Sequence, residues 1–171
     1  MLPYCGRAAC PPIRSLSEVS QTKTKTKSTS AESLSRFASR VQRVLGIQGE
    51  VNICVTSNRE MQSLNRRFRR KNKPTDVLTF PSAMPHPGGD IAISLEIAAA
   101  NAEQLEHSLD TEVKILILHG MLHLAGYDHE IDDGEMHIRE AELRRRLNLP
   151  VGLIERAHEF AAKTSRKRRR S

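Results

Sequence analysis

Cysteine is scarce in this chain of 171 residues, and long hydrophobic runs are missing. The three cysteines, Cys5, Cys10 and Cys54, are too few and too unevenly placed for a disulfide scaffold, and no pair has the spacing of a zinc ribbon. We therefore expect a reducing compartment. The apolar stretches fall far short of the roughly 20 residues that cross a bilayer, so we expect no membrane partner.

Positive charge is concentrated at the two ends of the chain. Residues 1–30 contain five basic residues and one acidic residue, and residues 166–171 add five basic residues. Because the net charge of the whole chain is +7, residues 31–165 carry −2. The first 30 residues lack periodic apolar positions and cannot offset the entropy of ordering by burial. We predict disordered basic tails at 1–30 and 164–171 around a single domain at 31–163.

Periodicity within this domain predicts helices packed on a small mixed sheet, an α+β fold. A capping box at Ser57–Glu60 begins the second helix, and Asp110 is a good N-cap for a helix that is apolar on nearly every side. We expect that helix to be the buried central element. The predicted helices are 31–45, 57–73, 95–105, 110–126, 132–147 and 153–162, and the predicted strands are 51–56, 75–80 and 90–94.

Six basic residues crowd into eight positions near the end of the second helix, with no acidic residue between them. This density suits a phosphate backbone. The six are Arg66, Arg67, Arg69, Arg70, Lys71 and Lys73, and we expect Lys73-Pro74 to end the helix.

Three histidines on and after the central helix form a candidate metal site. His119 and His123 are four residues apart, so they project about 40° apart on one helix face. Gly126 can adopt the left-handed conformation that ends a helix and turn His129 back toward the same point. Three imidazole ligands suit catalytic zinc, which keeps a fourth position for water, whereas structural zinc usually has four protein ligands. The alternative is a buried helix with two hydrogen-bonded histidines.

The spacing H-x3-H-x2-G-x2-H is also that of the metzincin proteases, whose second residue is a glutamate that serves as general base. Gly120 stands at that position here. Peptide hydrolysis would lack its usual proton acceptor, so a metallopeptidase is the runner-up interpretation.

The stretch from His119 to His129 resembles the signature of the YbeY family of zinc-dependent endoribonucleases. Leu64–Pro81 resembles the family's second motif, and Gly89–Ser94 resembles its third. Together with a similar downstream helix, the likeness covers about residues 34–149. Asn72, where aspartate is usual, and Thr79, where serine is usual, are small departures that concern RNA contacts.

The resemblance implies a cytoplasmic, single-strand-specific endoribonuclease, a hydrolase of phosphodiester bonds. It implies a role in ribosomal RNA maturation, at the 3′ end of the small-subunit RNA, and in ribosome quality control. One Zn²⁺ per chain would be held by His119, His123 and His129 in a zincin-like site at the end of the central helix. The domain at 31–163 would be catalytic, its partner would be the ribosome or its RNA, and a monomer is assumed. Organelle targeting by the N-terminal tail is a minor alternative.

Arg69 matches the family's arginine, and we expect it to pair with the scissile phosphate as a catalytic residue. We list Arg69, Arg70, Lys71, Lys73 and Asp76 as substrate-binding candidates, although Asp76 also suits a turn cap. A third interpretation is a ribosome-associated RNA-binding protein whose zinc is only structural. That protein would bind RNA without turnover.

Overall fold

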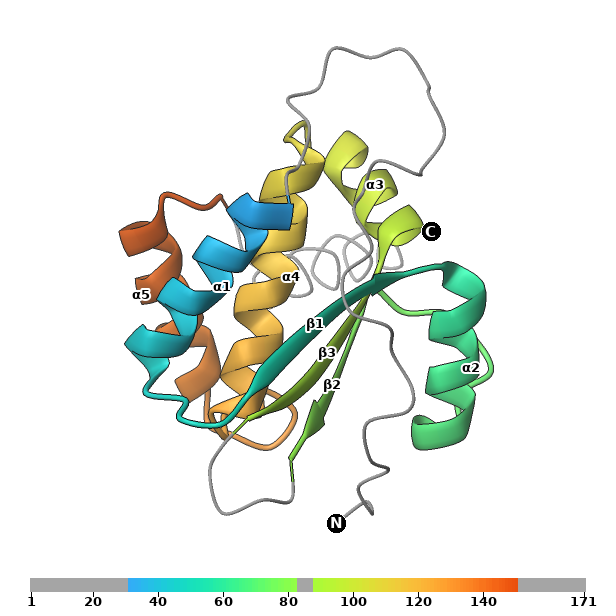
Figure 1. The fold of residues 1–171 in the computed structure, drawn as a ribbon, viewed down its shortest axis with the longest axis horizontal. Helices are drawn as coiled ribbons and strands as arrows, with labels where there is room; N and C mark the ends of the chain where they lie inside the picture. Colours follow the sequence, from blue (N-terminus) through green and yellow to red (C-terminus); the bar gives the residue numbers. More distant parts are fainter. Residues whose placement is uncertain (1–30, 83–87, 151–171) are drawn as a thin grey trace, which may run out of the picture. The chain divides into compact units, whose positions relative to one another are not determined.

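The computed structural model describes residues 31–82 and 88–150, which contain three strands and five helices (Figure 1). The α+β class predicted from the sequence is confirmed. The elements are α1 (Ala31–Leu45), β1 (Val51–Thr56), α2 (Asn58–Arg69), β2 (Val77–Pro81), β3 (Gly89–Ser94), α3 (Leu95–Gln104), α4 (Leu109–Leu124) and α5 (Glu135–Leu147). The predicted helix at 153–162 lies outside the described residues.

The chain divides into two compact units, Met1–Ala125 and Gly126–Ser171. All the strands and α1 to α4 belong to the first unit, and α5 belongs to the second. The predicted boundaries, a single domain at 31–163 between two tails, stay a prediction. Among the described residues, no helix combines the length and apolar character of a membrane span.

The sheet is mixed, with strand order β1-β3-β2. β1 runs parallel to β3, and β2 runs antiparallel to β3, as expected for two strands joined by a short return. β2 begins at Val77 rather than at Thr75, where the sequence predicted it. The Asp76 carboxylate accepts the backbone N–H of Val77, and the Asp76 carbonyl accepts the N–H of Ser94 just before β2 begins.

The two faces of the sheet pack against different helices, because side chains alternate along a strand. On one face, Leu78 and Ala92 form a buried cluster with Met61 of α2. On the other face, Ile91 and its register partner Thr79 lie against α4. The sheet therefore separates α2, with its basic end, from the helix that carries the histidines.

α4 is the central element that its apolar sequence predicted. It packs against α1, α3, β2 and β3. Residues on all its sides are buried, from Val113 through the run Ile115–Leu122. Its N-cap is Ser108 rather than the predicted Asp110, since the Ser108 hydroxyl accepts the backbone N–H of Thr111. Asp110 lies in the first turn instead, where a carboxylate favours the helix dipole.

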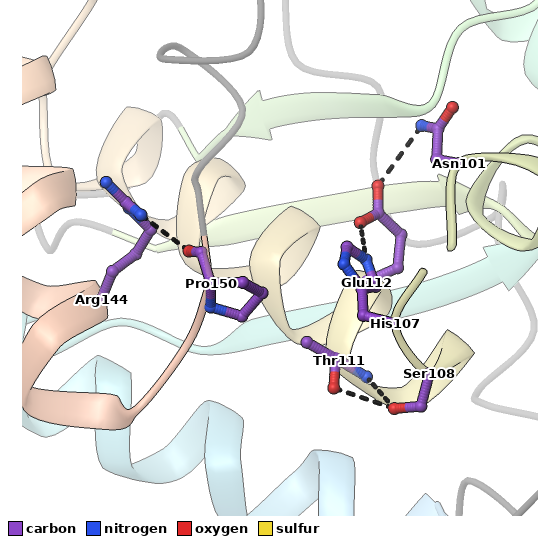
Figure 2. Close-up of polar contacts among 7 residues, drawn as sticks. All are labelled: Asn101, His107, Ser108, Thr111, Glu112, Arg144 and Pro150. Carbon is purple, nitrogen blue, oxygen red and sulfur yellow. Dashed lines mark hydrogen bonds and ion pairs between the residues drawn. The ribbon is translucent and has the colours of Figure 1, made fainter. Parts of the chain in front are cut away.

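A buried carboxylate ties the end of α3 to the start of α4. Figure 2 shows the Glu112 carboxylate between the His107 ring, at 2.7 Å, and the Asn101 amide, at 3.3 Å. Glu112 is 0% exposed, so these partners offset part of the cost of burying its oxygens. The contact fixes the entry of α4 into the core.

The second unit contains α5, within the range predicted for a helix at 132–147. Asp132 lies before its first turn and accepts the backbone N–H groups of Gly134 and Met136. Arg144, in the last turn of α5, donates a hydrogen bond to the carbonyl of Pro150, which follows the helix (Figure 2). The acidic start predicted for this helix is therefore present.

Candidate metal centre

His119 and His123 lie one turn apart in the last part of α4, with their rings directed toward each other. Their Nε2 atoms are 3.2 Å apart, and the ring planes make an angle of 77°. His119 is buried, and His123 is half-buried. The α4 helix thus presents two imidazole nitrogens at a single point, as the spacing predicted.

His129 joins this pair. The chain leaves α4 through Ala125 and Gly126, and the φ angle of Gly126 is +96°, the left-handed conformation expected there. Each of His119, His123 and His129 offers one ring nitrogen, and these three nitrogens lie within 4.8 Å of one another. The group can therefore hold a metal ion. No Asp, Glu or Cys from residues 31–82 or 88–150 adds a fourth ligand atom to it.

Gly120 bears directly on the protease alternative. A Cβ atom at this position would lie 2.9 Å from Cγ2 of Ile91 and 3.2 Å from the Thr79 hydroxyl. Gly120 faces the sheet at close contact, so glycine is required there for packing. Glycine also lacks the carboxylate that serves as general base in the metzincins. A glutamate in the place of the metzincin base would not fit this arrangement.

Replacing Gly120 by valine tests this packing. We expect Gly120→Val to lower the free energy of unfolding by about 2 kcal/mol, because the added methyl groups overpack the interface with β2 and β3. Ala100→Val places the same side chain at an exposed position of α3 and is expected to cost less than about 1 kcal/mol. Urea denaturation measures both, and equal losses would show that Gly120 has no special packing role.

The basic residues lie at and after the end of α2, and all six are exposed. The helix ends at Arg69, so the sequence prediction of an end at Lys73-Pro74 is wrong. Arg70 adopts a left-handed conformation, with φ of 57°, and its N–H bonds to the carbonyl of Asn65. The residue in such a left-handed C-cap is usually glycine, so an arginine at this position did not indicate from the sequence that the helix ends here.

The loop that follows, Arg70–Lys73, is held by the amide side chains of Asn65 and Gln62, which were not among the residues predicted from the sequence. The Asn65 amide donates to the carbonyl of Lys73 at 2.7 Å, and the Gln62 amide donates to the carbonyl and side chain of Asn72 at 3.3 Å. Asn65 is 3% exposed, so it is a polar residue on the buried side of a helix. Such a residue needs a hydrogen-bond partner, and this was the feature that could have indicated its role.

The acidic candidate Asp76 and an acidic residue beside His129, Asp128, both have structural partners. One carboxylate oxygen of Asp76 accepts from the Thr75 hydroxyl and from the Val77 N–H, which is the turn-capping role that the sequence also allowed. Asp128 accepts the N–H of Glu130 and shapes the turn next to His129. Binding of substrate by Asp76 stays a prediction.

α2 and α4 pack on opposite faces of the sheet, but their C-terminal ends lie toward the same end of the strands. Both helices run downward in Figure 1, so the basic end of α2 and the last turns of α4 both lie toward the lower ends of the strands. β2 also ends there at Pro81. The first unit thus places the exposed basic residues at the end of α2 and the His119–His123 pair of α4 toward the same end of the strands.

Comparison with known proteins assigns the family. The family model described as endoribonuclease YbeY matches residues 15–148. The chain belongs to the YbeY family. An endoribonuclease YbeY from Koribacter versatilis is 53% identical over 141 residues, which are 82% of this chain and 93% of the relative. One from Nautilia profundicola is 50% identical over 109 residues, 63% of this chain and 78% of the relative.

A solved structure has a similar fold. The solution structure of TM1509 from Thermotoga maritima matches with a TM-score of 0.50 and 33% sequence identity, over 65% of this chain and 76% of that one. The resemblance inferred from the three YbeY motifs is confirmed. These motifs fall on α2 and β2, on β3, and on the end of α4 with the turn that follows.

Proposed function

We propose that this YbeY-family chain is a zinc-dependent endoribonuclease that cleaves single-stranded segments of ribosomal RNA. The observation that carries the proposal is the group of three imidazole nitrogens without a fourth protein ligand among the described residues. Structural zinc usually has four protein ligands, whereas catalytic zinc has three and keeps a position for a reacting oxygen. The relatives named endoribonuclease YbeY support RNA as the substrate.

The histidine pair fits the size of zinc. With Zn–N bonds of 2.0–2.1 Å, two ligands of a tetrahedral ion are about 3.3 Å apart. The Nε2 atoms of His119 and His123 are 3.2 Å apart. Imidazoles suit zinc, as they also suit copper, iron and nickel, so the three side chains are compatible with zinc as the metal.

The residues of this chain divide the work between chemistry and binding. Bound zinc supplies a Lewis acid and lowers the pKa of water toward neutrality. Arg69, at the end of α2, pairs with the scissile phosphate and stabilises the negative charge that develops there. Arg70, Lys71 and Lys73 bind the neighbouring phosphates of the same strand, and their positive charge sets the affinity for RNA.

In the cell, we propose maturation of the small-subunit ribosomal RNA at its 3′ end and ribosome quality control, in the cytoplasm and as a monomer. The family resemblance supports this role. The test is to supply the purified protein with ribosomal RNA that retains its 3′ extension, and to map the product ends. Cleavage confined to unrelated RNA would contradict the cellular role while leaving the activity in place.

One assay separates the three candidate activities. The purified chain is given single-stranded RNA, the corresponding duplex and casein, and its bound metal is measured. Cleavage of single-stranded RNA alone supports the proposal. Cleavage of casein alone would establish the metallopeptidase, and bound zinc with neither activity would establish an RNA-binding protein with structural zinc.

Salt dependence tests the phosphate contacts of the loop. Removing the charge with Lys71→Ala or Lys73→Ala is expected to reduce the slope of log affinity against log salt by about 0.7 for each lysine. Fluorescence anisotropy of a labelled single-stranded RNA measures this slope. Arg59→Ala, which removes an exposed charge at the other end of α2, is the matched control and is expected to leave the slope unchanged. An unchanged slope in the lysine variants would remove them from the binding surface.

A further inference from the structure

The loop Arg70–Lys73 is held in one shape by α2 itself. The backbone carbonyl of Asn65 accepts the N–H groups of Arg70 and Lys71, the latter at 3.3 Å. The side chain of the same residue donates to the carbonyl of Lys73 at 2.7 Å. Asn65 therefore contacts the loop at its beginning and at its end.

These bonds leave the charged groups of the loop exposed. Asn65 is 3% exposed, whereas Arg70, Lys71 and Lys73 are all exposed. Gln62 adds a second amide that reaches Asn72 in the middle of the loop. The polar atoms that organise the loop thus lie on its helix side, and the three cationic side chains remain accessible to a phosphate chain.

We propose that Asn65 is a positioning residue for RNA: it holds Arg70–Lys73 in the conformation that presents three cations to successive phosphates. The inference rests on the proposed function and deepens it. A loop without these bonds would have to be ordered when RNA binds, and the lost conformational freedom would weaken binding. Asn65 acts through the three cationic side chains and does not itself contact RNA.

The first test is Asn65→Leu, which keeps the size and charge of the residue approximately unchanged and removes the amide. We expect KM for single-stranded RNA to rise about tenfold. Without the amide, the loop and its long side chains become ordered only when RNA binds, and the entropic cost of that ordering weakens binding. The value of kcat and the bound metal are expected to stay at the native level. A fall in kcat with unchanged KM would overturn the proposal.

A double-mutant cycle separates positioning from general stabilisation. In the background Arg70→Ala, Lys71→Ala, Lys73→Ala, the side chains that Asn65 positions are gone. There we expect Asn65→Leu to lower kcat/KM by less than about threefold, because mutations that act through the same groups are not additive. A full tenfold further loss in this background would show that Asn65 acts by another route and would overturn the proposal.

The chain offers a matched control in α1. The Gln42 amide donates to the carbonyls of Ile47 and Gly49 and so holds the loop after α1 as Asn65 holds the loop after α2. Gln42→Met is expected to leave KM for RNA unchanged even where it lowers the melting temperature. An equal rise of KM in Gln42→Met would mean that any loss of stability weakens RNA binding, which would contradict the positioning role.

Two further measurements keep the inference separate from folding and from catalysis. Gln62→Met removes the second amide at a half-buried site, and it is expected to raise KM in the same direction if Asn65→Leu does not fold. The same double-mutant cycle is also measured by equilibrium binding of labelled single-stranded RNA, which does not depend on cleavage. Native protein that binds but does not cleave would refute the proposed function, whereas an additive cycle in binding would refute the role of Asn65.

Discussion

His123→Ala is expected to abolish RNA cleavage and metal binding together. His123 supplies one of three ring nitrogens within 4.8 Å of one another, and removal of one leaves a pair that cannot retain the ion with the same affinity. We expect metal affinity and kcat/KM each to fall by more than about a hundredfold, since even changes behind the ligands commonly cost tenfold to a hundredfold. His123 is half-buried, so truncation there leaves less of a cavity than truncation of the buried His119 would.

The measurement combines elemental analysis of the purified protein with cleavage of single-stranded RNA. His86→Ala is the control, because His86 has no other histidine at ligand spacing in the sequence. Circular dichroism establishes that both variants are folded. A folded His123→Ala protein that has lost its metal and still cleaves RNA at the native rate would show that the histidine group is not the centre of the reaction.

Arg69→Ala is expected to reduce kcat by a factor of roughly 10² to 10³ with the metal content unchanged. Removal of one group that stabilises developing charge in a transition state has effects of this size. Arg69→Lys keeps the positive charge but not the two-pronged geometry of a guanidinium, and we expect it to recover only part of the rate. Single-turnover cleavage of saturating RNA measures the chemical step without the contribution of binding.

Arg59→Ala is the matched control for Arg69, because both are exposed arginines of α2 at opposite ends of the helix. Loss of rate in both variants alike would indicate a general effect of charge on RNA binding. Full kcat in Arg69→Ala would remove this residue from the mechanism, and a loss of bound metal would assign it a role in the metal centre instead.

Local patterns in the sequence predicted most of the elements, and the misses have local causes too. α1 and β1 have the predicted bounds because apolar periodicity marks both clearly, and Gly46 marks the end of α1. The predicted end of α2 was too late because the left-handed residue that ends the helix is Arg70, whereas glycine is the usual residue in that conformation. The cap of α4 was misplaced because Ser108 and Asp110 are both good N-caps, and only the hydrogen bond to Thr111 distinguishes them.

The candidate site shows a different division. Spacing along one helix, followed by a glycine turn, was enough to predict that His119, His123 and His129 would meet, because helix geometry and a left-handed turn are local properties. The role of Asn65 was not predictable, because its partner Lys73 is reached only after the helix has ended and the chain has turned back. Such a contact depends on where the helix stops.

The sequence by itself therefore determined the candidate ligands and the charge, namely three histidines at ligand spacing and six basic residues at the end of another helix. Only the tertiary structure decided that Gly120 of α4 is a packing residue, since its neighbours Thr79 and Ile91 come from the strands β2 and β3. The physical reason is that hydrophobic periodicity specifies which face of an element is buried but not which atoms it meets there. Close packing between segments that are distant in the sequence fixes those contacts. It therefore also decides that α4 has no room at Gly120 for the carboxylate side chain of a metzincin base.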